Sequence, residues 1–249
     1  MVSKRRYTLI LTTFLAVLSL TAMFPSTALA DNGPLGSNTA GWDISWPQCD
    51  GPVPGVRPDM FHAVGVTDGT PFTLNPCLAS QFWGAGSAGS LSLYVNLDFG
   101  TMNGAGPLGC AADDQNCQAY NYGWGAGVSA WFSASRATGG ASEGVPLWWL
   151  DVETENYWSD NTDQNAYVIQ GALDFLQHTA GRTVGIYSTH YQWRIIAADF
   201  APPSTPNWVA GASSINDVAQ CQNPLWNGGT VWEFQYLNLD ANLDQDRGC

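Results

Sequence analysis

Strand-like apolar runs alternate with helix-like segments through the first two-thirds of the chain that follows residue 30. This alternation is typical of a parallel sheet covered by helices, because parallel neighbours need a long crossover connection. In the last third, short strands and the prolines 202, 203 and 206 leave little room for helix, as in a barrel that lacks its final helices. We expect strands at 41–46, 62–66, 91–97, 147–152, 183–187, 208–210 and 230–236, and helices at 76–86, 119–138, 164–179 and 192–199.

The first thirty residues have the pattern of a secretory signal peptide. Lys4, Arg5 and Arg6 precede an apolar run from about residue 7 to residue 24, and Thr-Ala-Leu-Ala ends at Ala30. The alternative is an uncleaved membrane anchor, but Thr and Ser interrupt the run, which is shorter than the roughly 20 apolar residues of a spanning helix. We therefore expect a signal peptide at 1–30, a single domain at 31–249, and a secreted, extracellular protein without membrane contact after cleavage.

The charge after residue 30 is strongly negative. Five Arg and no Lys stand against 21 acidic residues, a formal charge of −16. Because a phosphate backbone attracts the opposite sign, nucleic acid is excluded as a partner. A neutral glycan suits such a surface, and we expect a monomer, since self-repulsion favours solubility.

Six cysteines, an even number, lie after residue 30, which indicates disulfides in an exported protein. We expect neighbours in sequence to pair, Cys110 with Cys117 across a short polar loop, then Cys49 with Cys77 and Cys221 with Cys249. Zinc ligation is the alternative, but the chain has no CxxC and its three histidines stand far apart. We expect no metal and no cofactor.

The segment 146–153 is an apolar strand whose end carries Asp151 and Glu153. Side chains alternate along a strand, so these two carboxyls face the same way. In a barrel of parallel strands the active site gathers at the carboxyl ends, and close carboxyls raise one pKa so that a proton is held near neutral pH. Such a proton is the general acid that cleavage of a glycosidic bond needs. The alternative is a solvated strand end or a helix cap.

Two further acids stand in similar short motifs. Asp43 lies near the start of the expected mature domain, and Asp244 lies five residues before residue 249. Each alone would read as a turn residue, but eight short motifs follow one another in order across residues 41–246. They are Gly41-Trp-Asp43-Ile-Ser45, Gly65-Val-Thr-Asp68-Gly69, Tyr94-Val-Asn96, Leu150-Asp151-Val-Glu153, Gly185-Ile-Tyr187-Ser188, Trp208-Val-Ala210, Phe234-Gln235-Tyr236 and Leu243-Asp244-Gln-Asp246. In this order they resemble the strand motifs of the family 25 glycoside hydrolases, the lysozyme-like muramidases and their relatives of unassigned activity.

The resemblance implies an α/β fold, a flattened TIM-like barrel of five β/α units followed by three further strands. It also implies four acids around a groove. Glu153 would protonate the leaving oxygen, Asp151 would orient an N-acetyl group or face the oxocarbenium-like centre, and Asp43 and Asp244 would fix the sugar and tune Glu153. The implied substrate is bacterial cell-wall glycan, with peptidoglycan first.

The chain departs from the family pattern at four positions. Val66 stands where the family has Lys, Asp68 where it has Glu, Asn96 where it has His, and Asp246 where it has Asn. The catalytic pair is intact but the substrate contacts differ, so glycan cleavage is better supported than cleavage of peptidoglycan in particular. A glycosidase for another wall polysaccharide and a carbohydrate-binding barrel without turnover stay open, because fold does not fix function.

The chain has twelve tryptophans, and aromatic faces stack on sugar rings as readily as they fill cores. We expect Trp149 and Trp232 to point into the outer core. His190 is either a groove residue or a solvated loop histidine. The residues expected to contact substrate are Tyr94, Asn96, Trp148, Tyr187 and Gln235.

Overall fold

The computed structural model describes residues 33–86, 90–102, 106–238 and 243–249. The expected signal peptide at 1–30, with its cleavage point, lies outside the described residues. Within the described ranges, no helix is both long enough and apolar enough to cross a membrane.

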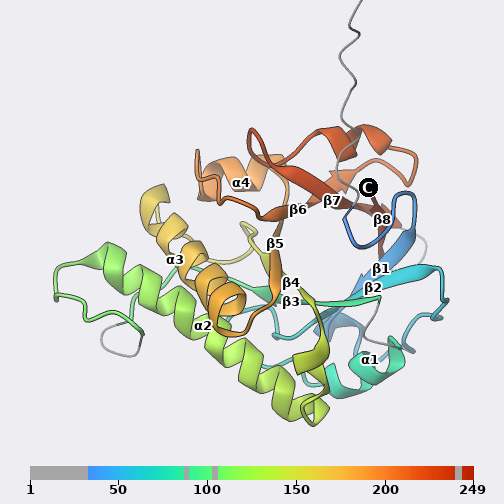
Figure 1. The fold of residues 1–249 in the computed structure, drawn as a ribbon, viewed down its shortest axis with the longest axis horizontal. Coiled ribbons are helices and arrows are strands. Elements are labelled where there is room, and N and C mark those ends of the chain that lie inside the picture. Colours follow the sequence, from blue (N-terminus) through green and yellow to red (C-terminus); the bar gives the residue numbers. More distant parts are fainter. Residues whose placement is uncertain (1–32, 87–89, 103–105, 239–242) are drawn as a thin grey trace, which may run out of the picture.

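Eight strands form one closed barrel (Figure 1). Neighbours in sequence pair in parallel from β1 to β7, and β8 closes the ring by pairing antiparallel with both β7 and β1. The α/β barrel expected from the sequence is thus confirmed. The strands are β1 Ala40–Ile44, β2 Met60–Gly65, β3 Leu91–Asn96, β4 Leu147–Asp151, β5 Thr183–Ser188, β6 Pro206–Ala212, β7 Thr230–Asn238 and β8 Leu243–Gly248.

Four helices occupy the connections up to β6, namely α1 Leu78–Gly84, α2 Gln115–Thr138, α3 Thr162–Asp174 and α4 His190–Ile196. All four match expected helices. Helix α2 begins four residues earlier than expected, because the Asp114 side chain accepts from the Cys117 amide and caps its first turn. A π-helical turn at Phe175–Thr179 extends α3, and only the short 3₁₀ turn Trp46–Gln48 lies between β1 and β2.

Helices α2 and α3 pack side by side against one flank of the barrel (Figure 1). Two glycines permit the close approach. A Cβ at Gly123 would lie 1.8 Å from the carbonyl oxygen of Val168, and one at Gly171 would lie 2.1 Å from that of Tyr120. Since real Cβ atoms do not come so near, any side chain at either position would push the helices apart.

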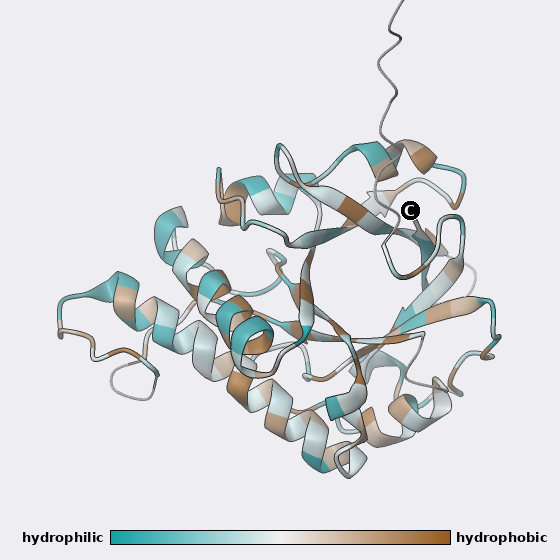
Figure 2. Ribbon diagram, in the orientation of Figure 1, coloured by the Kyte–Doolittle hydropathy of each residue, from teal (hydrophilic) through white to brown (hydrophobic). Residues whose placement is uncertain are grey.

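Buried apolar side chains form two layers. The outer layer lies between strands and helices and includes Val64, Trp148 and Ile186, whereas the inner cluster fills the barrel and includes Ala63, Trp149 and Trp208. Figure 2 shows α2 as mostly pale with brown residues at intervals, consistent with a helix rich in small residues that meets the barrel along one side.

All six cysteines are paired as expected, Cys49 with Cys77, Cys110 with Cys117 and Cys221 with Cys249. The second bridge joins the loop before α2 to its first turn. The third joins the segment before β7 to the end of β8, so it fastens the two strands that close the barrel.

Candidate active site

A cavity of about 150 Å³ opens at the carboxyl ends of the parallel strands. Asp151 is the last residue of β4 and Asn96 the last of β3, while Asp43 stands one residue before the end of β1. All four acids expected from the sequence lie here, with four of the five expected substrate contacts. The lining residues are Asp43, Ser45, Tyr94, Asn96, Asp151, Glu153, Tyr187, Trp208, Gln235 and Asp244.

Asp151 and Glu153 form the first carboxyl pair. Asp151 is buried, and the Nδ2 of Asn96 donates a hydrogen bond to its Oδ2. The hydroxyl of Thr67 in turn donates to the Oδ1 of Asn96 at 2.6 Å, which fixes the direction of the amide. Burial, and then the charge of Glu153, raises the pKa of Asp151 well above its ordinary value. Burial, and then the charge of Glu155, raises the pKa of Glu153 to about 7.

Asp43 and Asp244 form the second pair, directly opposite each other across the antiparallel β1–β8 ladder. The Nε2 of Gln235 donates to Asp43 at 2.9 Å, and the Tyr187 hydroxyl donates to the Oε1 of Gln235 at 2.7 Å. Burial first, and then the charge of Asp244, raises the pKa of Asp43 to about 7. Burial raises the pKa of Asp244 as well. Asp43 and Asp151 are therefore each held by an amide that a hydroxyl orients.

Small residues on β2 leave space for the aromatic part of the cavity. A Cβ at Gly65 would lie 2.6 Å from the Cβ of Ser45 and 2.8 Å from the ring of Tyr94. The Tyr94 and Tyr187 rings both meet Trp208, with ring centroids 6.1 and 4.5 Å away. The cavity thus combines four carboxyls with aromatic faces, the two features that sugar recognition and cleavage require.

Trp148 does not lie at the cavity, contrary to expectation. Side chains alternate along β4, so Trp149 and Asp151 point into the barrel while Trp148 points toward the helices. Its ring packs on Trp131, with centroids 5.6 Å apart, and is fully buried. The expectation that Trp149 and Trp232 point into the outer core was also wrong, since both pack with the inner cluster. Alternation along β4 accounts for Trp149, whereas Trp232 lies at the register shift between β6 and β7, where no residue of β6 pairs with it.

The sequence analysis missed Ser45 and Trp208 as cavity residues. Ser45 could have been found, because it lies two residues after Asp43 and so on the same face. Trp208 follows an irregularity of register between β6 and β7 that no sequence pattern announces. His190, left open above, is the first residue of α4, and its Nε2 lies 2.9 Å from the carbonyl oxygen of Asn223.

Two more acids lie deeper in the barrel, Glu233 on β7 and Asp246 on β8. Both are completely buried. Asp246 accepts a hydrogen bond from the Trp208 indole at 2.9 Å, whereas neither oxygen of Glu233 has a hydrogen-bond partner among the described residues. Burial, followed by the charge of Asp43, raises the pKa of both well above the ordinary value. In the described ranges, no three His, Cys, Asp or Glu side chains are grouped so as to hold a metal ion.

Comparison with known proteins places this arrangement among lysozyme-like folds. The profile of the family described as lysozyme-like protein 1 matches residues 137–212, the segment that carries Asp151 and Glu153. The probable GH family 25 lysozyme 5 of Dictyostelium discoideum is 38% identical over 76 residues, which cover 28% of this chain and 35% of that protein. The match thus spans about a third of the length of this relative.

Solved structures share the fold over a larger part of the chain. The bacterial lysozyme of Streptomyces coelicolor aligns with a TM-score of 0.55 at 16% identity, over 85% of this chain and 92% of that one. The modular autolysin LytC of Streptococcus pneumoniae, solved with a synthetic peptidoglycan ligand, aligns with a TM-score of 0.53 at 14% identity, over 84% of this chain and 46% of that one. The resemblance to family 25 lysozymes that the strand motifs indicated is confirmed by the matched segment and the fold.

Proposed function

We propose that this chain, a relative of the family 25 lysozymes, is a secreted glycoside hydrolase that cleaves bacterial cell-wall glycan, with peptidoglycan as the expected polymer. One observation carries the proposal. Acids from β1, from β8 and from the carboxyl end of β4 line a single cavity, and two of them, Asp151 and Glu153, stand two residues apart.

Glu153 is the general acid of the proposed mechanism. Its pKa of about 7 keeps a proton on the carboxyl near neutral pH, and its side chain is only partly buried, so a glycosidic oxygen can reach it. As the bond between the anomeric carbon and the glycosidic oxygen breaks, the Glu153 proton passes to that oxygen and the leaving sugar departs as an alcohol. A water molecule completes the hydrolysis: its oxygen bonds to the anomeric carbon, and its proton returns to the Glu153 carboxylate.

Asp151 acts as the carboxylate that faces the developing positive centre. Two carboxyls so close share one proton near neutral pH, and its position decides the roles. Burial, the charge of Glu153 and a hydrogen bond to Glu153 favour the protonated form of Asp151, whereas the amide of Asn96 donates a hydrogen bond to Asp151 and favours its ionised form. A positive charge that develops at the anomeric carbon adds to the second effect, so we propose that the negative charge lies on Asp151 and the proton on Glu153 as the bond breaks.

Asp43, Asp244 and Gln235 position the sugar. Gln235 is fixed by the Tyr187 hydroxyl on one side and by Asp43 on the other, so its direction is set before substrate enters. Oriented groups of this kind lower the cost of organising a site around substrate. The Tyr94 and Tyr187 rings supply apolar faces for the sugar.

Export and the choice of polymer rest on separate observations. The signal-peptide pattern at 1–30 and three disulfides are typical of proteins that fold outside the cytoplasm. Peptidoglycan is favoured because the structurally similar autolysin was solved with a peptidoglycan ligand. Of the four departures from the family pattern, Asn96 donates a hydrogen bond to Asp151 and so bears on the catalytic pair itself. Val66 and Asp246 are fully buried, so neither contacts a polymer directly, and Asp68 is the exposed one.

The proposal is tested by incubating the secreted protein with purified peptidoglycan and a panel of other wall polysaccharides. Products are identified by mass spectrometry. We expect glycan fragments with a newly formed reducing end from at least one polymer, peptidoglycan first. Binding to a polymer without release of fragments from any of them would contradict the hydrolase proposal and leave a carbohydrate-binding barrel.

A further inference from the structure

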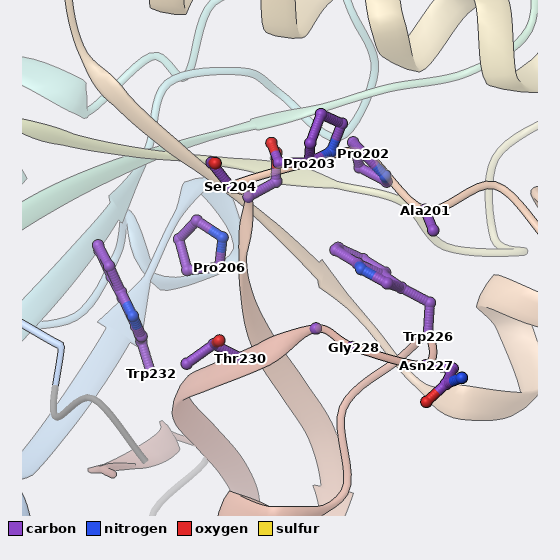
Figure 3. A pocket seen from close by; sticks show the side chains of 12 residues that line it. Ala201, Pro202, Pro203, Ser204, Pro206, Trp226, Asn227, Gly228, Thr230 and Trp232 are labelled. Carbon is purple, nitrogen blue, oxygen red and sulfur yellow. The ribbon is translucent and has the colours of Figure 1, made fainter. Parts of the chain in front are cut away.

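A second pocket, of about 370 Å³, opens at the end of the barrel opposite the acids. Figure 3 shows this pocket from close by. Its lining comes from residues 201–206, which lead into β6, from residues 226–230, which lead into β7, and from Trp232. Because β6 and β7 begin here and the catalytic cavity lies where the parallel strands end, the two pockets occupy opposite faces of the barrel. We call this the tryptophan pocket.

Two indole rings form its walls. Figure 3 shows Trp226 and Trp232 on opposite sides, with Pro206, Thr230 and Gly228 between them. Trp226 packs on Trp193, with ring centroids 5.2 Å apart.

A hydrogen bond and a disulfide restrain the backbone near both tryptophans. The amide of Cys249 donates to the Trp232 carbonyl at 2.8 Å, and Cys249 is disulfide-bonded to Cys221, five residues before Trp226. The rest of the lining includes Pro202, Pro203 and Pro206, whose rings fix their φ angles. A pocket held in this way loses little conformational entropy when a ligand binds.

The chemistry of the lining excludes charged ligands. None of its residues carries a charge, so a phosphate or a carboxylate would meet no cation and a basic peptide would meet no carboxylate. The polar side-chain groups present are the hydroxyls of Ser204, Thr205 and Thr230, the amide of Asn227 and the indole N–H groups of the two tryptophans. The matching ligand is neutral, with apolar faces and its own hydroxyls.

A sugar ring meets these requirements better than a proline-rich peptide. Pro202, Pro203 and Pro206 contribute carbonyl acceptors but no N–H donors. A polyproline segment presents carbonyls without N–H groups, so it could accept from the hydroxyls and the Asn227 amide but would offer no donor to the carbonyls of the lining. Sugar hydroxyls donate to carbonyls, and the C–H faces of the ring stack on indole.

We infer that the tryptophan pocket is a second carbohydrate site, which holds a neutral sugar residue of the polymer away from the acids. The seven residues of β6 span on the order of 20 Å. A single sugar therefore cannot touch both sites. One long polysaccharide chain can, and so can two neighbouring chains of the same wall polymer. Engagement of both sites raises the affinity for polymer without a new contact at the bond that is cleaved.

The test measures binding rather than turnover, with Glu153→Gln as the parent so that little polymer is consumed during the measurement. Co-sedimentation with insoluble peptidoglycan, and separately with chitin, gives the dissociation constants. We expect Trp232→Ala to weaken binding to at least one polymer roughly tenfold, as expected for loss of one aromatic stacking partner. Trp232→Phe should restore part of the affinity, and Asn227→Ala, at an exposed position, should weaken binding about threefold. Trp83→Ala is the matched control, because Trp83 on α1 is 62% exposed and far from the pocket in sequence.

Further arms separate this inference from the proposed function. With Glu153 intact, Trp232→Ala should leave hydrolysis of a short soluble oligosaccharide unchanged while slowing release of fragments from the insoluble polymer.

Equal polymer binding by the parent, Trp232→Ala and Asn227→Ala would overturn the inference, as would Trp232-dependent binding of a proline-rich peptide in place of either polymer. If wild type cleaves nothing but binds polymer through Trp232, the hydrolase proposal fails and this inference stands. If Trp232→Ala does not fold, the Asn227→Ala and Trp232→Phe results decide.

Discussion

The barrel holds two layers of acids that differ in their access to solvent. Asp43, Asp151, Glu153 and Asp244 line a cavity, whereas Glu233 and Asp246 are sealed beneath them. Both layers project inward from barrel strands, and burial raises the pKa in both. Only the upper layer can pass a proton to a ligand. The same chemical group thus has a proposed catalytic role in one layer and a cost in stability in the other.

The largest expected effect tests the upper layer at Glu153. Glu153→Gln keeps the size of the side chain and removes the transferable proton, so turnover should fall by about 10² to 10⁴ while the affinity for glycan changes little. Rates and dissociation constants on the same polymer measure both quantities. Asp160→Asn, at an exposed loop position beyond β4, should retain full activity. Equal activity of Glu153→Gln and wild type would remove Glu153 from the mechanism.

Asp151→Asn decides which carboxyl of the pair is charged. If Asp151 is the carboxylate, as Asn96 favours, then replacing it with a neutral amide removes a charge that stabilises the transition state, and kcat should fall by about 10² or more. If Asp151 instead holds the proton in the working enzyme, Asn mimics that state and much of the activity survives. Single-turnover rates at pH 6 distinguish the two outcomes.

Glu233→Gln tests the lower layer through stability. The folded-state pKa of Glu233 lies well above that of the unfolded chain, so the folded protein binds more protons, and its free energy of unfolding falls as pH rises through about 4.3, the ordinary pKa of Glu. The variant should therefore be more stable than wild type at pH 7, and this advantage should shrink toward pH 4.

Denaturant unfolding at both pH values measures the difference. Glu143→Gln, at an exposed position, should show no such pH-dependent gain. Turnover of Glu233→Gln should stay close to that of wild type. A variant that is equally stable at pH 7 and loses activity would place Glu233 in the upper layer's chemistry.

The smallest effect concerns the pH profile. Activity should decline as pH rises through about 7, because Glu153 must keep its proton. The charge of Glu155 helps to hold that proton, so Glu155→Gln should move the alkaline limb of kcat/KM toward lower pH without abolishing activity. Asp160→Asn should leave the limb in place. A limb that moves to higher pH in Glu155→Gln would contradict this account of the Glu153 pKa.

Sequence alone predicted most of the barrel and the acids of the upper layer. Strand motifs are local, and the alternation of Asp151 with Glu153 already put both on one face. The same alternation contradicts the choice of Trp148, whose odd-numbered neighbours Trp149 and Asp151 point inward. That error came from judging aromatic residues by their chemistry instead of by their register.

The lower layer could not be predicted because it depends on which strands become neighbours. Glu233 lies opposite Gly248, and Asp246 lies opposite both Gly41 and Gln235, in a ladder formed by distant parts of the chain. No periodic pattern distinguishes a sealed acid from one that faces a cavity. The tryptophan pocket was missed for a similar reason, since two loops must meet before its walls exist.

Closure of the barrel by β8 has a consequence for when the site comes into being. Asp244 meets Asp43 only after β8 has paired with β1, which joins the two ends of the described chain. Such long-range pairing is among the slower steps of folding, because the intervening chain must first be ordered. On the proposed route of export, the cavity is complete only once β8 has emerged and paired with β1, so the proposed activity starts no earlier than that step.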